Sequence, residues 1–157
     1  MCFRSSVHYA RDAAVAFKGR RYVSALIACQ HSWEMAGKAA LGVEGGYAWP
    51  PPPKTWMTRH SVFSDVIKSC GRLVLPPRIR RTLNRLESWL PPGASHANPP
   101  LNTEYIFDAG AAWAIPSQYF NRSRAQTAIR GIIETLELVK GAYRIELKHL
   151  SSSVPNI

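Results

Sequence analysis

Cysteines, acidic residues and long apolar runs are all scarce in this 157-residue chain. The three cysteines, Cys2, Cys29 and Cys70, are too few and too scattered for a disulfide framework, and none forms a C-x-x-C pair of the kind that binds zinc. No apolar run approaches the roughly 20 residues of a membrane span. We therefore expect no membrane association, a cytoplasmic location, and thiols at positions 29 and 70 that are buried as small apolar groups.

The motifs of familiar catalytic and cofactor sites are also missing. The chain has no H-E-x-x-H pattern, no phosphate-binding loop ending in G-K-S/T and no G-x-S-x-G serine nucleophile. His8, His31 and His96 have no partners at metal-ligand spacing. We therefore expect no bound metal and no cofactor.

The charge is strongly one-sided, because 20 lysines and arginines face only 10 acidic residues and the formal net charge is +10. Such an imbalance favours RNA, DNA or an acidic protein as partner. Arg78, Arg81 and Arg85 form the densest basic cluster, and their spacing places them on one helical face. Because guanidinium groups bind phosphates well, these arginines are candidate contacts for a nucleotide or RNA; the alternative is a solvated helix face.

Five segments show apolar residues in alternating steps of three and four, the period of a helix. We predict helices at about Ser5–Lys18, within Gly19–Gly42, from Thr58 to about Gly71, from Pro76 to about Leu90, and over Arg122–His149. The prolines gather between these segments and predict long, stiff loops. The apolar stretch 104–116 is expected to form a short helix or to lie on the core.

The predicted fold is all-α: an up-and-down helical bundle of about five helices with long Pro-rich loops. A single domain should cover residues 1–150, followed by a frayed tail at 151–157. We expect it to dimerise through an exposed apolar face.

The second predicted helix has an apolar seam and, beside it, a polar stripe. The seam comprises Tyr22, Leu26, Cys29, Trp33, Ala36 and Ala40. In the stripe, Gln30, Glu34 and Lys38 are each four residues apart, and Glu34 precedes Lys38 in the order that favours an ion pair. We interpret the pair as a structural brace between helices; the alternative is that Lys38 contacts a ligand phosphate.

Several stretches of the chain, taken in order, resemble one family. They are G-R-R-Y-x-x-A, then A-C-Q-H-S-W-E-M-A-G-K-A-A-L, then T-R-H-S-V-F-S-D-V-I, and finally Y-F-N-R-S-R-A-Q-T-A-I-R-G-I-I-E-T-L-E-L-V. Over roughly Val7 to Tyr143 the chain resembles a HEPN domain, the nucleotide-binding helical domain of higher eukaryotes and prokaryotes. The resemblance implies a helical bundle, a homodimer, a small nucleotidyltransferase as partner, and in some members an RNA-cleaving toxin.

The resemblance also bears on individual residues. It implies that Lys38 lines a nucleotide cleft. His60, at the start of the third predicted helix, is a further candidate, since a helix N-terminus attracts phosphate; a packed structural histidine is the alternative.

The toxin branch of the family carries an arginine and a histidine separated by four residues. Its two subunits form one metal-independent ribonuclease site, in which histidine is the general acid or base and arginine stabilises the phosphate. Arg144 and His149 give the only such spacing here, with apolar Ile145 in the place of a polar residue. The alternative is a solvated helix end, where cations complement the dipole.

Three functions therefore stay open. The leading one is a HEPN-like domain that binds a nucleotide or RNA and partners a nucleotidyltransferase. The second is a ribonuclease that uses Arg144 and His149. The third is a dimeric adaptor whose positive surface binds an acidic protein.

Overall fold

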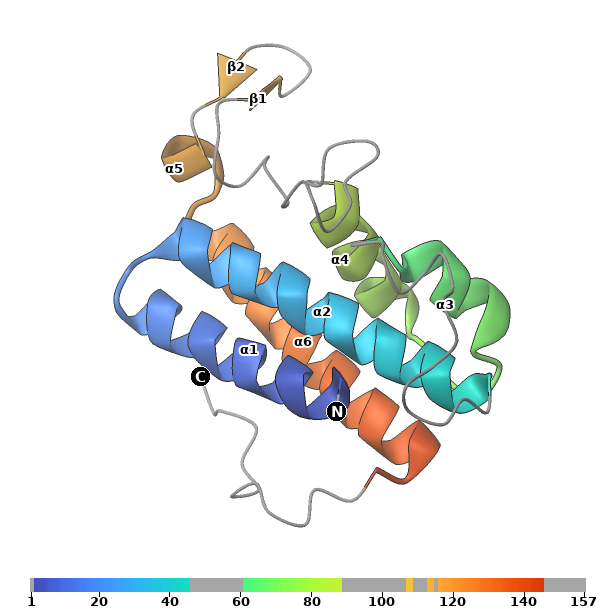
Figure 1. Cartoon of the computed structure of the whole chain (residues 1–157). Coiled ribbons are helices and arrows are strands. Elements are labelled where there is room, and N and C mark those ends of the chain that lie inside the picture. The colour runs from blue at the N-terminus through green and yellow to red at the C-terminus, as the bar shows by residue number, and fades with distance from the viewer. Residues whose placement is uncertain (1, 46–60, 89–106, 109–112, 115, 146–157) are drawn as a thin grey trace.

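The computed structural model describes residues 2–45, 61–88, 107–108, 113–114 and 116–145 (Figure 1). The helices are α1 (Cys2–Lys18), α2 (Tyr22–Glu44), α3 (Phe63–Ser69), α4 (Pro77–Ser88), α5 (Pro116–Tyr119) and α6 (Arg122–Tyr143). Two-residue strands β1 (Phe107–Asp108) and β2 (Trp113–Ala114) pair in antiparallel fashion. The all-α prediction is confirmed, while the predicted Pro-rich loops at 50–53 and 91–92 and the tail at 151–157 lie outside the described residues.

The four longer helices alternate in direction, as an up-and-down bundle requires. Helices α1 and α2 form an antiparallel hairpin, whose turn places Arg20 in the left-handed region at φ 58°. Figure 1 shows α2 and α6 running the same way, with α1 packed against both and α4 running opposite to α6. At their shared end, the Tyr143 hydroxyl of α6 donates to Glu44 Oε1 of α2 over 3.1 Å.

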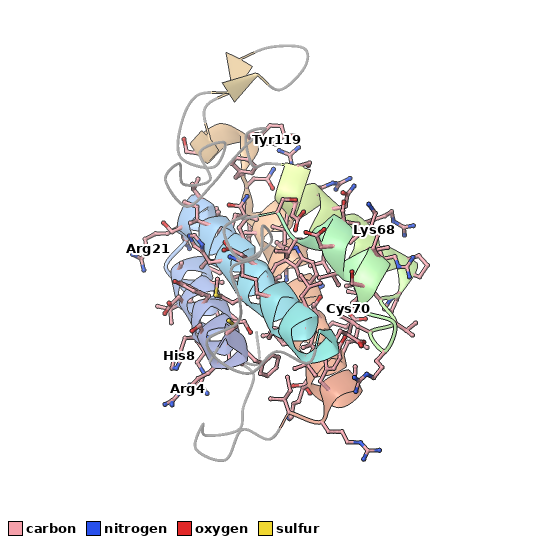
Figure 2. All side chains as sticks on the ribbon, turned by 45° about the vertical axis from the view of Figure 1, so that its right-hand side comes forward. Arg4, His8, Arg21, Lys68, Cys70 and Tyr119 are labelled. Carbon is pink, nitrogen blue, oxygen red and sulfur yellow. The ribbon has the colours of Figure 1, made fainter. Side chains whose placement is uncertain are left out.

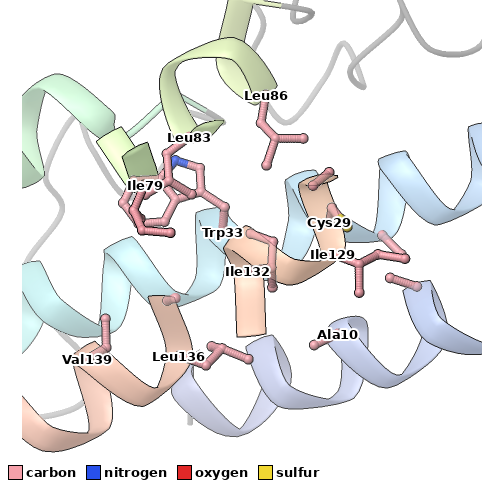
Figure 3. Packing of buried hydrophobic residues seen from close by; sticks show 14 of the residues in the cluster. Ala10, Cys29, Trp33, Ile79, Leu83, Leu86, Ile129, Ile132, Leu136 and Val139 are labelled. Atoms are coloured by element: carbon pink, nitrogen blue, oxygen red, sulfur yellow. The ribbon is translucent and has the colours of Figure 1, made fainter. Parts of the chain in front are cut away.

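Helix α2 is the centre of the bundle and packs against α1, α3, α4 and α6. Its predicted apolar seam is buried, apart from the half-buried Tyr22 at its start. Figure 3 shows Trp33 beside Ile79 and Leu83 of α4, and Leu136 of α6 facing Ala10 of α1. The polar stripe of α2 is buried as well, because helices surround α2 on nearly every side.

Glycines allow two pairs of helices to approach closely. A Cβ atom added to Gly37 of α2 would lie 2.5 Å from Cγ2 of Val62, which immediately precedes α3. A Cβ atom added to Gly131 of α6 would lie 2.7 Å from Cγ2 of Thr82 in α4. Both distances are too short for real carbon atoms, so these contacts depend on glycine.

The predicted end of the last helix is wrong. Helix α6 ends at Tyr143 and does not continue to His149. Arg144 adopts the left-handed conformation (φ 48°, ψ 44°), and the N–H groups of Arg144 and Ile145 donate back to the carbonyls of Gly141 and Lys140. This arrangement terminates the helix by satisfying its last carbonyls.

Two other predicted boundaries need correction. Helix α3 ends at Ser69, and Cys70 and Leu73 are buried from the turn that follows rather than from the helix. Thr58, its predicted N-cap, lies outside the described residues. Within the stretch 104–116, the described residues form β1 and β2, which lie away from the long helices, and α5 begins only at its last residue (Figure 1).

Candidate phosphate-binding site

Helix α4 separates apolar and basic side chains onto two faces. Pro77 suits the first turn, because the N–H group that proline lacks would have no helical partner at that position. Ile79, Leu83 and Leu86 are buried against the bundle. Arg78, Arg81 and Arg85 are exposed on the other side, so the predicted basic face is confirmed.

The antiparallel packing of α4 and α6 determines what lies opposite these arginines. Arg78, near the start of α4, forms an ion pair with Glu134 of α6. Thr82 contacts Gly131 one turn further along. Arg85, another turn on, therefore lies level with the first turns of α6.

A pocket of about 250 Å³ lies between these two helices. Four arginines line it, namely Arg78, Arg81, Arg85 and Arg124. Three hydroxyl groups line it too, those of Thr82, Ser123 and Thr127. The buried side chains of Leu86 and Ala128 form its apolar floor.

Arg124 is held in place by contacts with the residues that precede α6. Its guanidinium carbon lies 3.6 Å from the centre of the Tyr119 ring, and its Nη1 donates to the Tyr119 carbonyl. The backbone N–H of Arg124 donates to Oδ1 of Asn121, the N-cap of α6, over 3.2 Å. Figure 2 shows Tyr119 at the end of the molecule where nitrogen-tipped side chains of α4 project, whereas Arg4 and His8 project from α1 at the opposite end.

The pocket has an excess of positive charge. Glu134 pairs with Arg78, but in the part of the chain that the structure describes no carboxylate lies within ion-pair distance of Arg81 or Arg85. The N-terminal end of α6 adds the positive pole of a helix dipole beside Ser123. Like charges this close repel one another, and a bound anion would relieve the repulsion.

Lys38 lies in the interior and not at this pocket. Its Nζ is 2.5 Å from Glu34 Oε1, and the two side chains are 3% and 4% exposed. The predicted ion pair is thus present and buried. Gln30, one turn before Glu34, donates from Nε2 to the carbonyl of Leu86 and so ties α2 to α4.

The remaining predicted site residues are not brought together. Arg144 is exposed at the end of α6 opposite the pocket, outside the helix. His60 and His149 lie outside the described residues. The structure therefore unites Arg78, Arg81 and Arg85, and it adds Arg124, which the sequence analysis did not single out.

A second polar cluster, also unforeseen, surrounds the carboxylate of Glu87. Its Oε1 accepts from Trp33 Nε1 over 2.6 Å and from the N–H groups of Val62 and Phe63 over 2.8 Å, and its Oε2 accepts from Ser61 Oγ. Burial raises the pKa of Glu87, although these hydrogen bonds oppose the shift. Glu87 thus caps α3 from another helix, which is a structural role.

A third cluster joins the ends of α2 and α6. Glu44 Oε1 accepts from the backbone N–H of Arg72 over 3.0 Å and from the Tyr143 hydroxyl. The hydrogen bond from Arg72 lowers the pKa of Glu44. Burial raises the pKa of the neighbouring Cys70 thiol, which makes it a poor nucleophile.

Among the described residues, no group of three His, Cys, Asp or Glu side chains could hold a metal ion. None of the helices described is both long and apolar enough to cross a membrane. Comparisons with protein-family models, curated proteins and solved structures give no match. The pocket and the motifs of the sequence are therefore the features that bear on function.

Proposed function

We propose that this chain is a HEPN-like domain that binds RNA, and that the pocket between α4 and α6 contacts RNA phosphates. The observation that carries the proposal is the convergence of four arginines from two helices on one small pocket. Guanidinium forks bind phosphate oxygens in pairs, with geometry that a lysine cannot match. The net charge of +10 favours a polyanion over a single nucleotide as the partner.

The proposal keeps three further features expected from the sequence: a homodimer, a nucleotidyltransferase partner and a cytoplasmic location. Val74 and Ile67, which are 73% and 39% exposed near α3, supply apolar surface for a contact between two copies. The molar mass in solution, measured by light scattering, tests the dimer. The ribonuclease alternative is not part of the proposal, because Arg144 lies at the end of α6 opposite the pocket.

The test is the salt dependence of binding to a labelled single-stranded RNA of mixed sequence. We compare the wild type with Arg81→Gln/Arg85→Gln and with the control Arg4→Gln/Arg21→Gln, which removes the same charge from exposed positions in α1 and just before α2, outside the pocket. Each lost phosphate contact should flatten the slope of log K against log salt by about 0.7. The pocket variant should therefore lose about 1.4 of the slope, and the control should keep the wild-type slope.

Two results would contradict the proposal. Equal losses in the pocket variant and the control would mean that net charge alone attracts the RNA. Absence of binding by the wild type, together with binding of an acidic protein, would favour the adaptor.

A further inference from the structure

The shape of the pocket indicates which kind of phosphate it holds. The ion pair between Arg78 and Glu134 crosses from α4 to α6 and closes one end of the groove between them. The buried side chains of Leu86 and Ala128 close its floor. The lining is compact, so one phosphate group can contact arginines of both helices at the same time.

The charge of the pocket favours a phosphate at a chain end over a phosphate within the strand. An internal phosphodiester carries one negative charge. A phosphate monoester at a chain end carries about −1.5 to −2 at neutral pH and offers three strong acceptor oxygens. Arg81, Arg85 and Arg124 provide three guanidinium groups beyond the one that Glu134 partly neutralises. A monoester, with its charge near −2 and three acceptor oxygens, matches three guanidinium forks better than a phosphodiester does.

The donors of the pocket come from both sides and are partly fixed before a ligand binds. Arg124 is restrained by the ring and the carbonyl of Tyr119, so little side-chain entropy remains to be lost. The hydroxyls of Ser123 and Thr127, one turn apart on α6, add neutral donors beside it. The volume of about 250 Å³ lies just below the range of about 300 to 1,000 Å³ typical of small-ligand pockets. It suits a phosphate with its attached sugar and excludes a folded stem.

We infer that the pocket binds the terminal phosphate monoester of an RNA, with Arg81, Arg85 and Arg124 as its ligands. This inference depends on the proposed RNA binding and specifies which part of the RNA enters the pocket. A 5′-phosphate and a 3′-phosphate share this chemistry, so the experiment must separate them.

The experiment compares one short single-stranded RNA in three forms, with a 5′-phosphate, a 3′-phosphate or hydroxyls at both ends. Titration of the wild type should give about tenfold tighter binding for one phosphorylated form than for the hydroxyl form, the effect of one additional charge-assisted contact. Arg124→Gln should abolish this preference, and Arg124→Lys should reduce it, because lysine keeps the charge and loses the fork. Arg4→Gln, an exposed substitution in α1, should keep it.

The outcomes separate the inference from the proposed function. Equal affinity for all three RNAs, with weaker binding by Arg81→Gln/Arg85→Gln, would overturn the terminal-phosphate inference and leave RNA binding intact. Failure to bind any form would overturn both. A terminal-phosphate preference that survives Arg124→Gln would also overturn the inference, since the pocket would then not be its source. Circular dichroism of each variant verifies that the exposed substitutions leave the fold unchanged.

Discussion

The guanidinium of Arg124 stacks on the ring of Tyr119, five residues earlier in the chain, with 3.6 Å between the guanidinium carbon and the ring centre. The contact links α5 to the first turn of α6. It orients a cation of the pocket through an aromatic side chain that does not itself line the pocket.

Tyr119→Leu should weaken RNA binding without removing a charge. A stacked arginine of this kind contributes about 0.5 to 1 kcal/mol at an exposed position, so the affinity should fall about two- to fivefold. Fluorescence anisotropy with the labelled RNA measures the change. Tyr119→Phe is the control, because it keeps the ring, and its affinity should remain near that of the wild type. An equal loss in both variants would show that the hydroxyl, not the stacking, matters.

Gly131→Ala should destabilise the packing of α4 on α6. The new methyl group would lie 2.7 Å from Thr82 Cγ2, and overpacking of this kind costs about 1 to 3 kcal/mol, against a gain of about 1 kcal/mol in helix propensity. Urea denaturation should give a lower free energy of unfolding. Thr82→Ser removes the opposing methyl group, so the double variant should recover most of the loss. A double variant as unstable as Gly131→Ala would contradict the proposed clash.

Lys38→Ala should destabilise the fold strongly, because it leaves Glu34 charged and buried. Breaking a buried ion pair costs about 3 to 5 kcal/mol. Thermal and urea unfolding measure the effect. Replacing both partners, in Glu34→Gln/Lys38→Met, also removes the carboxylate charge that Lys38 balances and should restore part of the stability. A Lys38→Ala variant of wild-type stability would show that the pair contributes little.

Replacement of Glu87 should reveal a pH dependence. Because burial raises its pKa in the folded state, the wild type binds this proton more tightly when folded. The contribution of Glu87 to stability is therefore complete below the ordinary value of 4.5 and is lost as the pH rises through the raised pKa. Glu87→Gln, which keeps the acceptor Oε1 and cannot ionise, should gain stability relative to the wild type over that pH range.

Unfolding curves between pH 4 and pH 8 measure this difference. Glu87→Ala is the contrasting variant, since it leaves Trp33 Nε1 and the N–H groups of Val62 and Phe63 without their acceptor. It should be about 3 kcal/mol less stable than Glu87→Gln at every pH. A constant difference between the wild type and Glu87→Gln would contradict the raised pKa.

Apolar spacing was sufficient to predict α2, α4 and most of α6, because each of these helices carries its apolar residues in one continuous stripe, even though α2 buries its polar stripe as well. The arginine face of α4 followed from the same period. The end of α6 did not, since the charged residues near Arg144 fit a helix as well as a turn, and only the backbone geometry decides between them. Local sequence patterns therefore predict the ends of helices less well than the presence of the helices themselves.

The site itself was only half predictable. The spacing of Arg78, Arg81 and Arg85 places them on one face without indicating what that face meets. Arg124 joins them through the antiparallel packing of α4 and α6, a tertiary contact that no local pattern encodes. One signal was available in the sequence. Asn121 is a typical N-cap residue, and it marks the start of α6 three positions before Arg124. Glu87 was missed for a related reason, because the helix that it caps is not its own.

The pocket between α4 and α6 is built from two helices that are separated in the chain by residues 89–121. Its arginines converge only when those helices dock, so the unfolded chain offers an anion no comparable set of donors. Ligand binding and folding are therefore thermodynamically linked: at a ligand concentration one hundred times its dissociation constant, the native state gains about 2.7 kcal/mol. The melting temperature of the protein thus reports occupancy of the pocket, and it does so for an unlabelled ligand.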